Sequence, residues 1–521
     1  MDTPFQLSGG LQFALAVTIV LYVAGMFALA VWAERKVKNA ADFVVAGRRL
    51  PLSLAWMTIM ATWFGAGTML TATETVREEG LLGAALDPFG CGVCLVLAGL
   101  LIARPLWKMG LLTVSDFFRR RFGPMAELIA SLILVPSYFG WIAAQFIALA
   151  NMLELYFGME AWLGILLVAL VGMGYTLLGG MWSVTLTDAV QLGVVLIGLA
   201  FLAWVAFADY GNGAGALAGV ERLMEEAEPE MLQIVPTETA TMFLAWLGVF
   251  CAGALGSMPG QDLTQRIFSA RSAGVAQGAC LVAGVVYLVV GLFPVGMGLL
   301  ARQLWPDGEM PSPTVAAFAQ QFFTPTGLII FTLALMSAVL STIDSAILSP
   351  ASILAQNVFP RVGVAGFSML AVNRIAVVMV TGASLIVAYL GESAYSLLEA
   401  AYDVIFVSLF VPLLLGIYLR PVSGVPANAC MLVGAALWTV HLVAGWDYFL
   451  QPWLAQPAVI TEETPPEAIS GAPSNLVITA VGLVVYLVLD AVYRLRGAQP
   501  LEDPEADKQI AAEDEAAQAP A

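Results

Sequence analysis

Apolar stretches of about 20 residues or more alternate along the chain with short polar connections. A helix needs about 20 apolar residues to cross a hydrocarbon core about 30 Å thick. The pattern therefore predicts an all-α polytopic membrane protein with about thirteen transmembrane helices. Their approximate ranges are 11–33, 51–75, 81–106, 124–156, 161–180, 187–208, 239–260, 273–303, 325–357, 368–390, 395–419, 426–446 and 474–495.

The composition supports this class and excludes others. Hydrophobic residues make up 60% of the 521 positions and charged residues 11%, against about 45–50% and about 25% in soluble domains. The net charge of −17 comes without a basic patch, so we expect the lipid bilayer, and no nucleic acid, as a partner. The five cysteines lie in apolar segments and His441 is the single histidine. This pattern argues against a disulfide set, a metal cluster and a histidine proton relay.

Basic residues predict the orientation. If the N-terminus is outside, 18 of the 21 Lys and Arg residues lie on the inner side, and only Arg77, Arg222 and Arg302 lie outside. Cytoplasmic loops are enriched in these residues, so we expect an outside N-terminus and a cytoplasmic C-terminus. The first apolar segment is followed by Glu34–Lys38, which is the wrong flank for a cleaved signal peptide. The expected location is the plasma membrane, which in a bacterium is the inner membrane.

The sequence divides into four predicted regions. Residues 1–39 form a leading transmembrane helix with its flank, 40–421 an inverted-repeat transporter core, 422–496 two additional helices, and 497–521 an acidic cytoplasmic tail. The tail is rich in Ala, Glu and Asp and has no apolar period, so we expect it to be disordered.

Glycines interrupt the second and seventh predicted helices. Ala61–Thr68 contains Gly65 and Gly67, and Gly253–Gly260 contains three glycines and Pro259, all of which lower helix propensity. Two interrupted helices five spans apart indicate a midplane binding site between inverted repeats, here helices 2–6 and 7–11. The alternative for such glycines is a small-residue face for helix packing.

The ninth predicted helix carries candidate ion-binding chemistry. Ser341 and Thr342 are adjacent, and Ala338 lies one turn before Ser341. Two hydroxyls and a carbonyl freed by the break in the second helix would offer neutral oxygen ligands to a monovalent cation. Hydroxyl side chains also join membrane helices to one another, so both interpretations are open. Asp344 is an ionisable group in a membrane helix and is by default functional, unless it is hydrated at the helix end.

A further motif combines a Gly-Gly turn with the start of the next helix. Asp188 in this motif either benefits from the helix dipole or receives a cation that leaves toward the cytoplasm. Together with two other segments, the motif resembles the sodium:solute symporter family over about residues 40–420. The matching positions are Tyr175…Gly179-Gly180…Thr187-Asp188…Gln191, Ala338…Ser341-Thr342…Asp344-Ser345 and Ala61…Phe64.

The resemblance implies a leucine-transporter-type (LeuT-type) 5+5 inverted-repeat fold with an extra leading helix. It also implies that Asp188 lies on the inward release path of sodium. Proton coupling is the alternative, and the uncharged hydroxyl pair favours sodium. The sodium ligands implied by the resemblance are the carbonyls of Ala61, Phe64 and Ala338 and the hydroxyls of Ser341 and Thr342.

Within the family, the chain looks closest to the choline- and proline-type transporters. Aromatic residues of the choline branch surround a quaternary ammonium, as cation–π attraction requires. Trp63 and Trp141 match two of these positions, although helix packing is an equal alternative for both. Cys91 stands where that branch has a tyrosine, and Gly260 where it has a tryptophan. The candidate substrate-binding residues are Trp63, Gly67, Asp87, Trp141, Gln261 and Tyr402.

These observations predict a sodium-coupled secondary active symporter that imports a small organic solute, such as an amino acid or a quaternary amine, by alternating access. We expect no enzymatic activity and no cofactor, with Na⁺ as the coupling ion. A proton-coupled symporter and a transporter-like sensor are alternatives, and a channel is disfavoured because the two interruptions are not equivalent. The sequence carries no information about the oligomeric state.

Overall fold

The computed structural model describes residues 8–305, 314–361, 363, 367–390, 394–446, 448–454 and 471–501. This part of the chain is helical, with two isolated bridges and no strand. Residues 502–521, which make up most of the acidic tail that the sequence predicts to be disordered, lie outside it.

The first half of the chain forms helices of very different length. The α-helices are α1 (Gly9–Glu34), α2 (Ala40–Val45), α3 (Leu52–Trp63), α4 (Ala72–Glu79), α5 (Cys91–Leu97), α6 (Ala103–Lys108), α7 (Val114–Phe122), α8 (Pro124–Phe157), α9 (Ala161–Tyr210) and α10 (Ala216–Glu226). Short 3₁₀ turns occupy η1 (Ala46–Arg48), η3 (Gly80–Ala84) and η6 (Pro229–Leu232). Widened π-helical turns occupy η2 (Gly67–Thr71), η4 (Ala85–Gly90) and η5 (Ala98–Ile102).

The second half repeats this mixture of long and interrupted helices. The α-helices are α11 (Ala240–Cys251), α12 (Gln261–Ser269), α13 (Ala273–Leu304), α14 (Thr314–Phe322), α15 (Pro325–Ile353), α16 (Met369–Tyr389), α17 (Ala394–Tyr418), α18 (Val425–Ala444), α19 (Gln451–Leu454) and α20 (Ser474–Leu495). The π turns η7 (Ala252–Gly256) and η8 (Leu354–Val358) follow α11 and α15, and the 3₁₀ turn η9 (Phe359–Arg361) follows η8.

Eleven helical runs of the described residues are long and apolar enough to cross a membrane. Two of them, Gly67–Lys108 and Ala161–Tyr210, each cover parts of two predicted segments, so all thirteen segments fall on helix. Within the second run the backbone leaves the helical region at Gly180 (φ 49°, ψ −140°), where the sequence predicts a turn.

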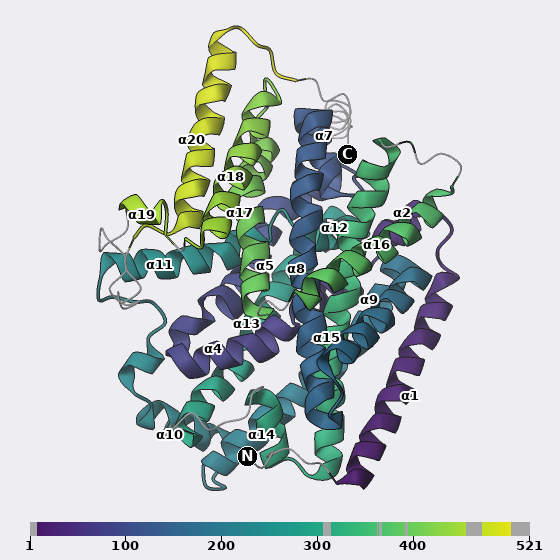
Figure 1. The fold of residues 1–521 in the computed structure, drawn as a ribbon, viewed down its shortest axis with the longest axis vertical. Helices are drawn as coiled ribbons and strands as arrows, with labels where there is room; N and C mark the ends of the chain where they lie inside the picture. The colour runs from purple at the N-terminus through teal and green to yellow at the C-terminus, as the bar shows by residue number, and fades with distance from the viewer. Residues whose placement is uncertain are drawn as a thin grey trace, which may run out of the picture.

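The long helices surround a central helix, α15, which packs against α8, α9 and α16 (Figure 1). Residues 334–353 of α15 are all buried, and the buried hydroxyls of Ser337, Ser349 and Ser352 donate to carbonyls one turn back in the helix. α1 lies along one flank against α9, while α18 and α20 lie side by side on the opposite flank. α1 and α20 thus lie at the periphery (Figure 1), and the division of the chain into a transporter core and outer helices stays a prediction.

Candidate ion and solute site

The second predicted helix is broken where its glycines indicate. α3 ends at Trp63, Phe64 has φ −82° and ψ 68°, and the helix resumes at Ala66. The Tyr287 hydroxyl donates to the freed Trp63 carbonyl at 3.2 Å. The Ala66 amide donates to Gln145 Oε1 at 3.1 Å. Irregular backbone at membrane depth is tolerated where protein surrounds it, and these two side chains meet that requirement.

Gly65 allows α15 to approach the break closely. A Cβ atom added to Gly65 would lie 2.3 Å from Thr342 Oγ1 and 3.1 Å from Gln145 Oε1. Real Cβ atoms essentially never approach other atoms so closely. The absence of a side chain at Gly65 therefore places the α15 hydroxyl directly against the broken segment.

A cluster of neutral oxygens joins α3 to α15. Ser341 Oγ lies 3.0 Å from the Ala61 carbonyl and 2.8 Å from the Ala338 carbonyl. Thr342 Oγ1 lies 3.1 Å from the same Ala338 carbonyl. The structure thus brings together four of the five residues predicted to bind sodium. The fifth, Phe64, lies at the break, and its ring meets that of Tyr287 edge-on at 5.5 Å.

Asp188 lies near this cluster on α9. Thr58 Oγ1 on α3 donates to Asp188 Oδ2 at 2.5 Å, and no described residue donates to Oδ1. Asp344 on α15 accepts from Ser345 at 3.3 Å and from Thr187 at 3.4 Å. Both carboxylates are fully buried, so Asp344 is not hydrated at a helix end in this structure.

Arg266 on α12 provides the only buried positive charge among the described residues. Its Nη2 donates to Ser345 Oγ at 2.5 Å and its Nε to the Thr58 carbonyl at 3.2 Å. These contacts connect α12 to α3 and α15 next to the two carboxylates, Asp188 and Asp344. The guanidinium accordingly moderates the negative charge of this region.

An aromatic cavity lies on the other side of the α3 terminus. Its volume is about 20 Å³, which is room for about one water molecule. Three of the predicted substrate residues, Trp63, Trp141 and Tyr402, line it together with Tyr138 and Asp262. Ser137, Ser257, Gly260, Ala401 and Ile405 complete the lining.

The other three predicted substrate residues lie elsewhere. Gly67 and Asp87 line a separate small cavity, where Asp87 accepts hydrogen bonds of 2.8 Å from both Thr68 and Tyr287. The side chain of Gln261 points toward the segment before α7 and accepts from the Val114 amide at 2.7 Å. None of the three contributes to the aromatic cavity.

Sequence reasoning missed Asp262, Tyr138 and Arg266. Asp262 accepts from Trp63 Nε1 at 2.7 Å and from the Tyr138 hydroxyl at 2.5 Å. A signal for two of them was present, because Asp262 and Arg266 are ionisable residues next to an interrupted membrane helix and such residues are functional by default.

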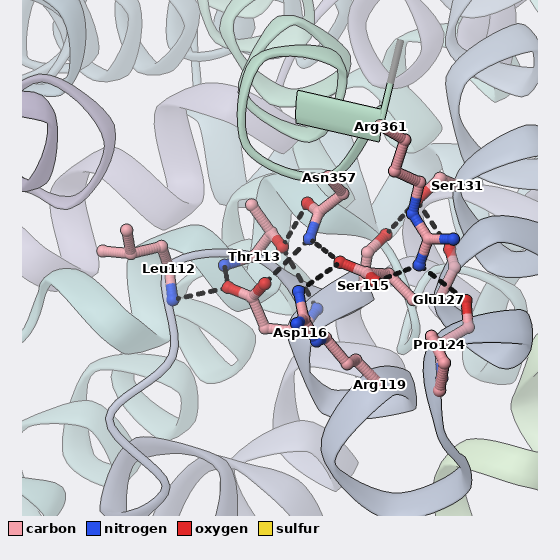
Figure 2. Close-up of polar contacts among 10 residues, drawn as sticks. All are labelled: Leu112, Thr113, Ser115, Asp116, Arg119, Pro124, Glu127, Ser131, Asn357 and Arg361. Carbon is pink, nitrogen blue, oxygen red and sulfur yellow. Dashed lines mark hydrogen bonds and ion pairs between the residues drawn. The ribbon is translucent and has the colours of Figure 1, made fainter. Parts of the chain in front are cut away.

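A second polar cluster holds the far end of α15 (Figure 2). Asn357 donates to Asp116 and to Glu127, at 2.8 Å in each case. Arg361 forms an ion pair with Glu127, whose side chain is 1% exposed. Thr113 and Asp116 form a capping box at the start of α7, so the cluster ties α7, α8 and the segment after α15 into one unit.

An all-helical protein with a broken spanning helix, a neutral oxygen cluster and an adjacent aromatic cavity has the architecture of a secondary transporter. A Na⁺-coupled sialic acid symporter, solved in a substrate-bound outward-open state, matches the structure with a TM-score of 0.71 at 15% identity, covering 95% of this chain and 99% of that one. The fold is the LeuT type with inverted repeats, as predicted.

Residues 43–434 match the sodium:solute symporter family, and the chain belongs to this family. It is 29% identical over 429 residues to the high-affinity choline transporter 1 of Drosophila melanogaster, covering 78% of this chain and 67% of the relative. It is 27% identical over 473 residues to the Mus musculus protein of the same name, covering 86% and 80%. The family consists of transporters and not enzymes, so the chain is a multi-pass membrane transporter of a sodium:solute symporter type.

Proposed function

We propose that the chain imports a small organic solute together with sodium by alternating access, with its N-terminus outside and its C-terminus in the cytoplasm of a bacterial-type plasma membrane. The observation that carries the proposal is the position of α3. Only Thr62 separates Ala61, whose carbonyl lies in the oxygen cluster, from Trp63, whose side chain lines the aromatic cavity. An ion that fixes the end of α3 would therefore also fix one wall of the cavity.

Sodium binds at Ala61, Phe64, Ala338, Ser341 and Thr342 in this proposal. The Ser341 and Thr342 hydroxyls can rotate their protons away and present oxygen to a cation. Neutral oxygens suit an ion that must bind and leave in every cycle. Asp188 receives sodium on its way to the cytoplasm. One of its carboxylate oxygens accepts from Thr58, and the other accepts from no described residue.

The solute binds against Trp63, Trp141 and Tyr402, which must move apart to admit it because the cavity has room for about one water molecule. The choline transporters among the relatives suggest that a quaternary amine is one class to test, along with amino acids. Each ligand must raise the affinity for the other by the same factor, because coupling between two binding sites is reciprocal.

Proton coupling is a second candidate. Four carboxylates, Asp87, Asp188, Asp262 and Asp344, are buried in the spanning segments, and a buried acid is a suitable proton carrier. The oxygen cluster favours sodium because none of its members can take up a proton at physiological pH.

The test measures thermal unfolding of the purified chain in liposomes with a panel of amino acids, quaternary amines, sugars and carboxylates. A ligand that binds the folded state stabilises it by about 2.7 kcal/mol at 100 times its Kd. We expect one solute class to stabilise the protein in sodium but not in potassium, and this stabilisation to disappear in Ser341→Ala. A shift that is independent of sodium, or that follows pH alone, would contradict the proposal.

A further inference from the structure

Three of the eight charged side chains that are buried among the described residues form an ion pair with an arginine. Asp42, Glu127 and Asp490 each form an ion pair with an arginine, namely Arg49, Arg361 and Arg494. The remaining buried charges are Arg266 and four acids, Asp87, Asp188, Asp262 and Asp344. The interior around the broken helix therefore has an excess of negative charge.

Asp262 differs from the other three acids because it lines the aromatic cavity. Arg266 lies one helical turn away on α12 but does not neutralise the Asp262 carboxylate by direct contact. Its Nη1 instead donates to the Asp262 main-chain carbonyl at 2.7 Å, and its other donors bind Ser345 and Thr58. No described Lys or Arg forms an ion pair with Asp262.

Two hydrogen bonds and a helix N-terminus partly offset the cost of burying an ionised Asp262 carboxylate. Tyr138 and Trp63 donate one hydrogen bond to each carboxylate oxygen, at 2.5 and 2.7 Å. The residue is also the second of α12, where the helix dipole stabilises negative charge. An ionised carboxylate has about four acceptor positions, so two remain for a ligand in the cavity.

The cavity walls suit a positive charge. Trp63, Tyr138, Trp141 and Tyr402 line the cavity together with Asp262, and ring faces attract cations within about 6 Å. No Lys or Arg is among the described lining residues. A buried carboxylate either takes up a proton or pairs with a positive charge, and a cationic solute in this cavity would supply that charge.

We propose that the solute is a small protonated amine with at least one N–H group, and that this group donates to the Asp262 carboxylate. A charge-assisted hydrogen bond is roughly twice as strong as a neutral one. A quaternary ammonium has no N–H to donate, and its methyl groups hold the nitrogen away from the carboxylate. The inference rests on the proposed symport function and names the solute class of that site.

A methylation series with one carbon skeleton tests this inference. The probes are ethanolamine, N-methylethanolamine, N,N-dimethylethanolamine, choline and the uncharged isostere 3,3-dimethylbutan-1-ol. Each is titrated against the full-length chain in liposomes, in sodium and in potassium, with thermal unfolding as the readout. The variants are Asp262→Asn, which keeps the shape of the side chain, and Glu225→Gln, a matched loss of one carboxylate on the exposed face of α10.

In sodium we expect at least one N–H amine to bind at least 10-fold more tightly than choline, and the uncharged isostere not to bind. Asp262→Asn should weaken the binding of that amine at least 10-fold. The variant should still be stabilised by sodium alone, and this stabilisation would show that it is folded. Glu225→Gln should bind like the wild type. Equal affinity for choline and the N–H amines, full affinity in Asp262→Asn, or no binding by any probe would overturn the inference.

The sodium comparison separates the two proposals. If an amine binds through Asp262 equally well in sodium and potassium, the proposed coupling is wrong and the amine inference is supported. If binding needs sodium but is unaffected by Asp262→Asn, the coupling is supported and the amine inference is wrong.

Discussion

Gly65→Ala should weaken sodium binding without unfolding the protein. The added Cβ atom would lie 2.3 Å from Thr342 Oγ1 and 3.0 Å from Thr342 Cβ, so α15 and the broken segment must separate by about 1 Å to reach an ordinary van der Waals distance. Overpacking of this kind costs roughly 1–3 kcal/mol. If that cost falls on the state that binds sodium, the affinity for sodium drops by about 5- to 150-fold.

A sodium titration of thermal stability measures this effect. Gly193→Ala is the matched control, because its added Cβ atom meets nothing within 4 Å and its sodium affinity should be unchanged. A wild-type sodium affinity in Gly65→Ala, or the same loss in Gly193→Ala, would refute the assignment of Thr342 to the ion site.

Three further changes test other parts of the structure. Ser341→Ala should weaken sodium binding at least 10-fold, because a hydrogen-bonding group that contacts a charge contributes about 1.5–3 kcal/mol; an unchanged sodium titration would contradict the proposed ligand set. Gly180→Ala should lower the free energy of unfolding by roughly 1–3 kcal/mol, since φ is +49° and the added atom would lie 2.5 Å from the Phe43 carbonyl; an unfolding curve like that of wild type would argue against the turn. Glu127→Gln should lower the free energy of unfolding by about 1–3 kcal/mol. This is less than the loss on breaking a fully buried ion pair, because the Arg361 side chain is 35% exposed. Thermal unfolding should show a larger effect for Glu127→Gln than for the exposed-site change Glu225→Gln.

The fold could be predicted in detail because the membrane restricts the alternatives. Apolar length identified every spanning segment, and two glycines in the segment around Gly65 located the break to within two residues. The hydroxyl pair of α15 was predictable for a similar reason. Ser341 and Thr342 are two of several polar residues of α15, which also carries Ser337, Asp344 and Ser345. Because a polar side chain in a membrane helix bonds to a neighbouring helix, the pair was expected to face a polar partner, which the broken α3 provides.

The solute cavity was harder to predict because it depends on helix rotation. Successive residues of an α-helix point about 100° apart, so Gln261 and Asp262 face different neighbours of α12. Gln261 faces α7 and Asp262 faces the aromatic rings, and the four residues of the Ser257–Gly260 linker determine which of the two occurs. Gly67 is subject to the same uncertainty, because the backbone angles at Phe64 set the direction of the chain after the break.

The arrangement of α3 gives a physical reason why ion and solute binding should be coupled. The last turn of α3 presents the Ala61 carbonyl to α15 and the Trp63 indole to Asp262, and the break after it removes the helical bonds that would otherwise hold this turn in place. The turn is therefore fixed by its contacts on both sides. In the proposed mechanism, a cation between Ala61 and Ser341 would restrain Trp63, and a solute against Trp63 would restrain Ala61. Each ligand reduces the conformational entropy that the protein still has to lose when the other ligand binds. Positive coupling therefore requires no other conformational change between the two sites.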